Sequence, residues 1–481
     1  MIIKRRSLFL LGFFLTGTIV FFLRPIDDCD ILTQIRLGYL GFDSFINKEM
    51  LIYWREGQAI TNPGWLAQLA FALLDKVGGL LLVRYAYSVL LTLAFVLVLR
   101  VTFLSIYTQY SIMSYAIGGF IGILIMHSNS SVRPQGFSLL GCALLFCLHY
   151  SEISVFRKLL LLALIGLLWQ NLHPSLPVGI LVYGLLSLQN FDKRRLQPWF
   201  WEIFAGAAIL AICCVLTPDG FDLIRISQEN QRISTVLGIS EWFPAWSPSV
   251  IAPMAPFLIF FSLGMIVLLI KRKAYRIQEV LLFAVFSAMT FYVARFGFYM
   301  ALLAIPFFVK TVEQIRPKHL FAWSPDAPVH KVNFIIMGLI YLALITGMIL
   351  YLPQVRSFFP REAIAALKNR PEVHRVFNYR EYGGALTYWG NNKWKLFIDG
   401  RLYLYPEETW RLYNGVALGD KDSINLLCEK YRPDAFFLLK SYSAGFLRQF
   451  DISENKLCGK KWIKLYENKE TVVLIPAGAP P

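Results

Sequence analysis

Three carboxylates stand close together near the start of the chain, at Asp27, Asp28 and Asp30. Carboxylates at this spacing repel one another, so the pKa of at least one should be raised unless a cation or a metal ion lies beside them. A carboxylate of this kind suits general-base catalysis, and the trio also offers oxygen ligands to a divalent metal ion, although the sequence makes no cofactor certain. The alternative interpretation is a solvated loop that keeps this segment away from a membrane.

A second group of polar residues stands at the ends of apolar runs further along the chain. Guanidinium groups at a membrane boundary suit a phosphate whose lipid tail lies in the bilayer. Arginine at such a boundary is also a common interfacial anchor, and a lone histidine there can serve as a cap or a packing residue. Beside Asp28 and Asp30 as catalytic candidates, the candidate substrate-binding residues are Arg36, Arg133, Gln135, Asn171, His173, Glu241 and Arg295.

The composition is that of a protein with many membrane spans. Of the 481 residues, 56% are apolar and 16% are charged, whereas a soluble domain averages about 45–50% apolar and about 25% charged residues. A helix needs about 20 mainly apolar residues to cross the hydrocarbon core, and the alternating pattern of β-barrel strands is absent. The sequence therefore predicts a polytopic α-helical membrane protein, with the lipid bilayer as its surroundings.

We expect about eleven spans in this chain. The first follows Lys4-Arg5-Arg6 and has no small-residue cleavage site after it, so we interpret it as a retained span and not as a secretory signal peptide. The apolar segment Trp65–Leu74 is bracketed by polar residues and should lie along the membrane interface. The expected spans are residues 7–23, 83–99, 111–127, 134–150, 158–171, 175–190, 200–216, 251–270, 278–294, 297–310 and 332–352.

Lys and Arg are unevenly shared between the loops that these spans create. They gather in segments on the same side as the N-terminus, such as Lys193-Arg194-Arg195 and Lys271-Arg272-Lys273. Such asymmetry predicts a cytoplasmic N-terminus and an extracytoplasmic C-terminus. The net charge of +16 follows mostly from these loops, so no nucleic-acid partner is predicted. All the candidate site residues then fall on the outer face, where they could form one site.

The expected spans lack the usual marks of transport and nucleotide chemistry. No Asp, Glu, Lys or Arg stands in the middle of an expected span, which disfavours an ion-coupled carrier. The chain also has no GxxxxGK[ST] phosphate loop and no HExxH zinc motif. A transferase without these marks needs a donor that arrives already activated.

Residues 353–481 form the second predicted domain, after the membrane domain of residues 1–352. Apolar strand-like runs alternate with helical ones, which predicts an α/β domain with a partly parallel sheet. Cys428 and Cys458 lie in this part and could form a disulfide or stay free. The expected strands are His374–Asn378, Lys395–Asp399, Asp434–Leu439, Trp462–Asn468 and Thr471–Ile475, and the expected helices are Pro360–Asn369, Pro406–Val416 and Lys421–Tyr431.

Short motifs follow one another along nearly the whole chain, beginning with the first-loop stretch from Asp28-Cys29-Asp30 to Gly38. They continue with Trp65–Gln68, Gly78-Gly79, Arg133-Pro134-Gln135, Trp169–His173, Glu241-Trp242, Arg295, Val376–Asn378, Gly383–Leu386, Phe397–Arg401 and Tyr405. In this order they resemble the bacterial GT-C-type membrane glycosyltransferases, and most closely a subgroup whose first loop reads D-x-D-x-W-x-H-x-x-x-G. Gln34 stands where that subgroup usually has His, and Gly64 where it often has Glu.

This resemblance implies a GT-C-like enzyme in the bacterial cytoplasmic membrane. It would take a sugar from a polyprenyl-phosphate donor at the outer face and pass it to an envelope glycan, lipid or protein. Asp28 or Asp30 would act as the base, while Arg133, His173 and Arg295 would hold the phosphate. We expect a single displacement that inverts the anomeric centre, although a second aspartate of the trio could support a retaining route. The alternatives are a flippase or exporter of lipid-linked saccharides and a non-catalytic assembly subunit.

Overall fold

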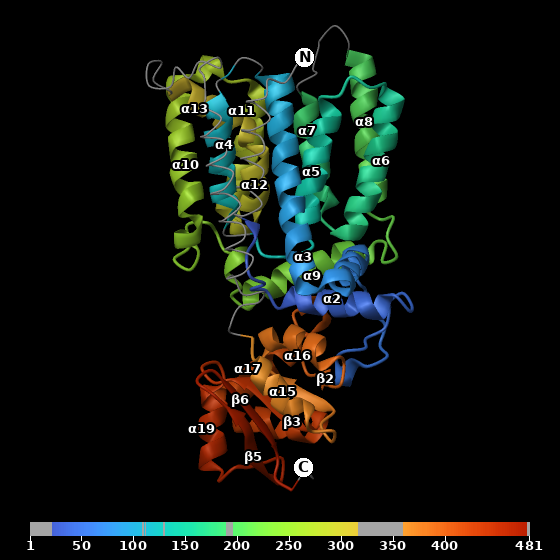
Figure 1. Cartoon of the computed structure of the whole chain (residues 1–481), viewed down its shortest axis with the longest axis vertical. Coiled ribbons are helices and arrows are strands. Elements are labelled where there is room, and N and C mark those ends of the chain that lie inside the picture. The colour runs from blue at the N-terminus through green and yellow to red at the C-terminus, as the bar shows by residue number, and fades with distance from the viewer. Residues whose placement is uncertain are drawn as a thin grey trace, which may run out of the picture. The chain divides into compact units, whose positions relative to one another are not determined.

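The structure, a computed structural model, describes residues 22–107, 110, 112–127, 130–188, 196–315 and 359–478. Within these residues the chain is mostly helical and ends in a six-stranded sheet (Figure 1). The span expected at 332–352 lies outside the described residues, as does nearly all of the span expected at 7–23.

The chain divides into two compact units. Among the described residues, unit 1 draws on Met1–Pro25, Leu80–Gly220 and Thr235–Gln354, and unit 2 draws on Ile26–Gly79, Phe221–Ser234 and Val355–Pro481. Unit 1 therefore holds most of the expected spans. Unit 2 combines the C-terminal sheet with the long first loop, which carries the aspartate trio.

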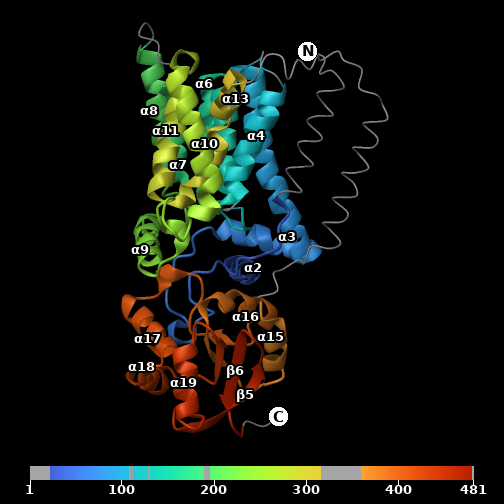
Figure 2. The ribbon, with the colours of Figure 1, turned by 90° about the vertical axis from the view of Figure 1, so that its left-hand side faces the viewer.

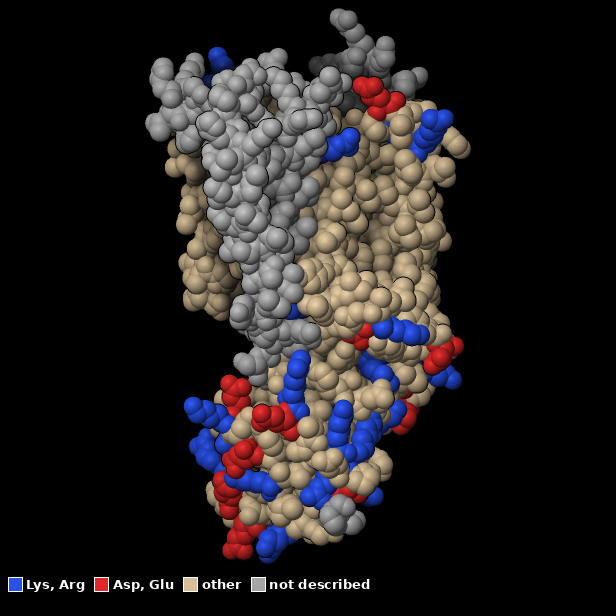
Figure 3. All heavy atoms as spheres, viewed as in Figure 1, with Lys and Arg blue, Asp and Glu red and all other residues tan. Residues whose placement is uncertain are grey.

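Unit 1 is a bundle of apolar helices that run side by side (Figures 1 and 2). Three described helices are long and apolar enough to cross a membrane: α3 (Trp65–Val101), which continues to Ile106, α6 (Val155–Leu172) and α10 (Ile251–Ile270). The visible face of the bundle is largely uncharged between its two ends (Figure 3). The shorter apolar helices of this unit include α4 (Ile112–Met126), α5 (Gly136–His149), α7 (Leu176–Ser187), α8 (Leu196–Cys213) and α11 (Ile277–Tyr292).

The last two described helices of the bundle form a bent pair. Helices α12 (Gly297–Leu303) and α13 (Ile305–Ile315) meet at 66°, and the segment from Ala294 to Ile315 is a fourth candidate span if the pair counts as one. Three or four candidate spans among the described residues support a membrane protein. The expectation of about eleven spans stays a prediction, because the other apolar helices are short.

Glycines let the helices of unit 1 approach closely. A Cβ atom added at Gly118 would overlap the backbone of Val309 on α13, and one added at Gly122 would overlap the carbonyl oxygen of Ala301 on α12. At Gly141 on α5, an added Cβ would enter the ring of Trp169. Small residues at helix contacts are typical of membrane bundles, where association depends on close packing of helices.

Helix α3 is broken where the two units meet in the sequence. Gly78 and Gly79 have non-helical backbone angles, with φ of −145° and +64°. Glycine tolerates the positive φ at little cost because it lacks a Cβ atom. The part from Trp65 to Val77, which includes the segment expected at the interface, therefore forms a helix of its own within unit 2.

The C-terminal sheet has the strand order β2-β1-β3-β6-β5-β4. Strand β1 pairs parallel with β2 and β3, and the remaining pairs are antiparallel, so the prediction of a partly parallel sheet is confirmed. The strands are β1 (Arg375–Asn378), β2 (Lys395–Leu396), β3 (Ala435–Leu439), β4 (Lys456–Leu457), β5 (Lys460–Glu467) and β6 (Thr471–Pro476).

Strand β2 is shorter than the expected strand Lys395–Asp399. The Phe397 amide still donates to the carbonyl of Val376 at 2.8 Å, but beyond it Asn378 takes the place of a ladder partner, because its Oδ1 accepts the amide of Ile398 at 3.4 Å. Its Nδ2 donates to the carbonyl of Ile398 at 2.9 Å. The chain therefore leaves the sheet early and forms the Asp399-Gly400-Arg401 turn.

Helices cover both faces of the sheet. In Figure 2, α15 (Arg361–Lys368) and α19 (Ala444–Ile452) lie on opposite sides of β5 and β6.

Helix α17 (Glu407–Leu418) confirms one expected helix, whereas the expected helix Lys421–Tyr431 consists of α18 (Lys421–Leu426) and a wider π-helical turn. Helices α16 (Gly383–Gly390) and α19 were not expected. A disulfide joins Cys428 and Cys458.

The first loop is bound to the sheet of unit 2. Leu396 on β2 donates its amide to the carbonyl of Leu51 at 2.8 Å, and the Trp54 indole donates to the carbonyl of Phe397 at 2.8 Å. Trp54 also packs against Tyr405 and Tyr431. The first loop is thus part of the sheet's hydrophobic core.

Candidate functional site

The candidate site residues fall into two groups that belong to different units. Asp28, Asp30 and Arg36 belong to unit 2. Arg133, Gln135, Asn171, His173, Glu241 and Arg295 belong to unit 1. Each unit gathers its own polar cluster.

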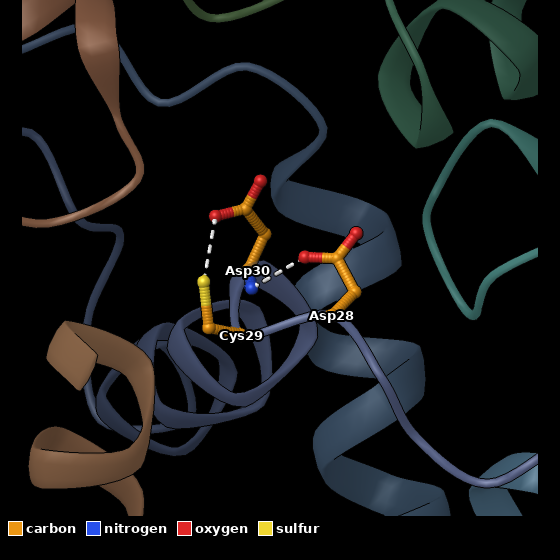
Figure 4. A group of neighbouring side chains, drawn as sticks. All are labelled: Asp28, Cys29 and Asp30. Carbon is orange, nitrogen blue, oxygen red and sulfur yellow. Dashed lines mark hydrogen bonds between the residues drawn. The ribbon is translucent and has the colours of Figure 1, made fainter. Parts of the chain in front are cut away.

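The acid cluster of unit 2 lies at the start of helix α2 (Asp30–Gly41) (Figure 4). Asp28 Oδ1 accepts the backbone amide of Asp30 at 2.9 Å, which satisfies one of the amides that every helix start leaves without an intrahelical partner. The Cys29 thiol donates to Asp30 Oδ1 at 3.8 Å. Asp28 is 8% exposed, whereas Asp30 is only half-buried. The two carboxylates therefore differ in their access to solvent.

The cluster has the composition of a candidate metal site. One ligand atom each from Asp28, Cys29 and Asp30 lie within 4.8 Å of one another. Two carboxylates fit a hard cation such as Mg²⁺, which proteins often hold through one or two carboxylates. Burial raises the pKa of the Cys29 thiol well above its usual value, and Asp30 and Asp28 raise it further. The thiol therefore stays protonated, so it is neither a good metal ligand nor a nucleophile.

Arg380 lies near this cluster, although the sequence analysis did not select it. Burial lowers the pKa of its guanidinium, but the carboxylates of Glu381 and Asp30 outweigh burial and raise the pKa. Arg380 stands between Val376–Asn378 and Gly383–Leu386, two of the motifs singled out in the sequence, so its place in the sequence was a usable signal. Arg36, by contrast, lies further along α2, and no hydrogen bond or ion pair joins it to Asp28 or Asp30 within the described residues.

The cluster of unit 1 centres on the carboxylate of Glu241, in a short 3-10 helix at Ser240–Trp242. Arg133 Nη1 donates to Glu241 Oε2 at 2.7 Å, and Arg295 Nη1 donates to Oε1 at 2.8 Å. The Arg295 guanidinium also lies over the Trp242 ring, 5.2 Å from its centroid. Burial raises the pKa of Glu241, but Arg295 and Arg133 outweigh burial and lower it to about 2.

Backbone hydrogen bonds hold the Glu241 segment in place. Ala294 donates its amide to the carbonyl of Phe243 at 2.9 Å, directly before Arg295. Ala245 donates to the carbonyl of Phe291, at the end of α11, at 3.3 Å. The loop after α9 (Asp222–Val236) is thus fixed to the turn that carries Arg295.

His173 lies in the same unit but stays neutral. Its Nδ1 is 2.8 Å from Ser138 Oγ and 2.9 Å from Ser175 Oγ. Burial lowers its pKa to about 3, and the charge of Arg295 adds to this effect. His173 therefore cannot contribute a positive charge to phosphate binding near neutral pH, but its ring can donate one hydrogen bond. Ser138 and Ser175 were not selected from the sequence.

The two amide candidates are Asn171 and Gln135, and both are buried. Asn171 Nδ2 donates to the carbonyls of Leu167 and Leu216 at 2.9 and 3.0 Å, which ties the end of α6 to the segment after α8. Gln135 is buried directly before α5. The two hydrogen bonds of Asn171 give this residue a structural role.

No family model matches this chain, and no curated protein matches it.

Proposed function

We propose that the chain is a GT-C-type membrane glycosyltransferase that transfers a sugar from a polyprenyl-phosphate donor to an envelope acceptor. The observation that carries this proposal is the pair Arg133 and Arg295, which stand far apart in the sequence and donate to the two oxygens of Glu241. A guanidinium has five N–H donors, so one that binds Glu241 can also bind a phosphate. Two such groups at one point suit the several oxygens of a lipid phosphate.

In this proposal His173 acts as a neutral hydrogen-bond donor beside the phosphate. Its low pKa excludes the role of a third cation beside Arg133 and Arg295. Arg133 and Arg295 stabilise the charge that grows on the phosphate as it leaves. Glu241 holds the two guanidinium groups together, because without a carboxylate between them they would repel each other.

Asp30 is the preferred base, and Asp28 supports it. Asp28 is nearly buried and accepts the amide of Asp30, whereas Asp30 is accessible to an acceptor. The acceptor oxygen forms a bond to the anomeric carbon, and the bond from that carbon to the phosphate oxygen breaks. Asp30 takes the acceptor's proton, and the polyprenyl phosphate leaves with the electron pair. This single displacement inverts the anomeric centre. A retaining route would need Asp28 as a nucleophile, and its burial disfavours that role.

The proposed location is the bacterial cytoplasmic membrane, with about eleven spans, the N-terminus in the cytoplasm and the C-terminal part outside. The three long apolar helices support a membrane location. The Cys428–Cys458 disulfide supports an external C-terminal part, because disulfides persist in oxidising compartments.

The test is a transfer assay with the full-length protein in lipid nanodiscs. Labelled polyprenyl-phosphate sugars and a bacterial envelope extract are added, and a labelled product is sought. We expect product with the wild type and with Asp451→Asn, which changes an exposed carboxylate of unit 2. Asp30→Asn and Arg295→Ala should lose at least about 100-fold in rate, as is common when a base or a charge-stabilising group is removed.

The outcome also separates the alternatives. A flippase would move a labelled lipid-linked saccharide across a sealed vesicle without forming a new glycosidic bond. An assembly subunit would form no product, and its role in cells would tolerate Asp30→Asn and Arg295→Ala. Transfer that Asp30→Asn and Arg295→Ala leave unchanged would refute the proposed roles of these residues.

A further inference from the structure

Two glycines of the C-terminal part lie directly against the Asp28-Cys29-Asp30 turn. A Cβ atom added at Gly384, on α16, would overlap the carbonyl oxygen of Cys29. One added at Gly400 would overlap Oδ1 of the Asp30 carboxylate. Neither glycine has a positive φ, so the constraint at both positions is the close approach to the turn and not backbone conformation. An added Cβ would meet fixed backbone at Gly384, whereas at Gly400 it would displace the Asp30 side chain.

Gly400 is held from both sides by a buried ionic network. Arg401 donates from Nε and Nη2 to Asp399 Oδ2 at 2.9 and 2.7 Å, and from Nη2 to Glu49 Oε1 at 2.9 Å. The Tyr405 hydroxyl donates to Asp399 Oδ1 at 2.8 Å. Asp399 is fully buried and Arg401 is 5% exposed.

The network also reaches the first loop. Glu49 Oε1 accepts the backbone amides of Leu51 and Ile52 at 2.7 and 3.0 Å. Charged groups buried in this way hold their geometry, because each depends on the others for its hydrogen bonds. The position of the Gly400 backbone is therefore determined by side chains on both of its neighbours in the sequence and by the first loop.

We propose that the Asp399-Gly400-Arg401 turn positions the carboxylate of Asp30, with Gly400 as the surface on which that carboxylate rests. The C-terminal part then belongs to the catalytic centre. The catalytic meaning of this arrangement rests on the proposed function. The positioning itself does not, and it can be measured without any substrate.

Cys29 offers a built-in reporter of this positioning. Its thiol donates to Asp30 Oδ1, the same oxygen that faces Gly400. It is also the one free cysteine of unit 2, since the other four free cysteines lie in unit 1. A displaced Asp30 would release the thiol, and the alkylation rate of Cys29 would rise. Mass spectrometry of the peptide that contains Cys29 separates it from the other cysteines.

The experiment compares Gly400→Ala with Gly445→Ala in the full-length protein in nanodiscs. Gly445, on α19, is a matched control because an added Cβ there would overlap the carbonyl oxygen of Leu418, elsewhere in unit 2. We expect Gly400→Ala to raise the Cys29 alkylation rate at least fivefold. We also expect it to lower kcat about 100-fold with little change in the KM for the donor, since misplacing a catalytic group by about 1 Å costs that much. Gly445→Ala should leave the Cys29 alkylation rate and kcat at wild-type values.

Each result bears on the proposal. Unchanged alkylation of Cys29 in Gly400→Ala, or an equal rise in both glycine variants, overturns the positioning role. If alkylation rises only in Gly400→Ala but the wild type transfers no sugar, positioning stands and the proposed function fails. If Gly400→Ala does not fold, Arg401→Lys replaces it, because lysine keeps the charge but loses the two-pronged contact with Asp399. An alkylation rate that Arg401→Lys leaves unchanged would then overturn the proposal.

Discussion

Replacing Glu241 with glutamine should weaken unit 1, because it removes the negative charge that Arg133 and Arg295 share. The amide keeps the size of the carboxylate and one acceptor oxygen. Its NH₂ group, however, would face one of the two guanidinium groups, donor against donor. Arg133 and Arg295 would then repel each other without compensation.

The size of this effect follows from the pKa of Glu241. Arg295 and Arg133 overcome burial and lower that pKa from its usual 4.5 to about 2, which corresponds to about 3 kcal/mol at 1.36 kcal/mol for each pKa unit. The side chains of Arg133, Glu241 and Arg295 are 26%, 21% and 28% exposed, so solvent screens part of this energy. We therefore expect Glu241→Gln to cost about 1–3 kcal/mol.

The dependence on pH gives the sign of the effect. A carboxyl whose pKa is lowered by folding adds stability above its unfolded pKa, and this stability is lost as the pH falls through the folded pKa. The melting temperature of the wild type should thus exceed that of Glu241→Gln at pH 7, and the difference should vanish between about pH 4.5 and pH 2. Thermal unfolding in detergent measures this difference in melting temperature. The control is Glu152→Gln, at an exposed position of unit 1. Equal melting temperatures of the wild type and Glu241→Gln at pH 7 would refute the reasoning.

Two further predictions concern unit 2, and amide hydrogen exchange of the full-length protein measures both. Arg401→Met should cost about 3–5 kcal/mol and speed exchange in β1 and β3, because it leaves two buried carboxylates without a cation. Arg411→Met, at an exposed ion pair, should cost less than about 1 kcal/mol, and a similar loss in both variants would contradict the argument. Cys428→Ser should cost about 3–4 kcal/mol, because the disulfide closes a loop of 30 residues, and protection near β4 that matches the wild type would count against this value.

Hydrophobic patterning was enough to predict the helical bundle and the strands of the C-terminal sheet. Long apolar runs and short β-branched runs are local signals, and β1, β3, β5 and β6 lie close to where such runs predicted them. Helix α16 was not predicted from the sequence, because its residues Gly383 to Gly390 include three glycines, which have low helix propensity. Gly383 and Gly384 lie where the helix packs closely against Asp399 and Cys29, and Gly390 lies against the Trp394 ring, which are tertiary contacts that no local pattern records.

The candidate site, like the fold, could be predicted from the sequence only in part. Arg133, Glu241 and Arg295 could be selected from their residue types and from the apolar runs that flank them, but the sequence could not reveal that one carboxylate joins the two guanidinium groups. The charge of His173 could not be predicted from the sequence, because its pKa depends on burial among Ser138, Ser175 and Arg295, which come from distant segments. Burial of an ionisable group is a property of the folded chain, so a residue list alone does not give its charge.

The two aspartates of the first loop illustrate how the fold separates residues that look equivalent in the sequence. Either could serve as a base by residue type. Once α2 begins at Asp30, the carboxylate of Asp28 is committed to the amide at the helix start and is nearly buried. Asp30 remains accessible and rests on Gly400, a residue 370 positions away whose backbone is fixed by Asp399 and Arg401. The choice between the two carboxylates is therefore made by the C-terminal part of the chain, so this part cannot be treated as an independent accessory domain.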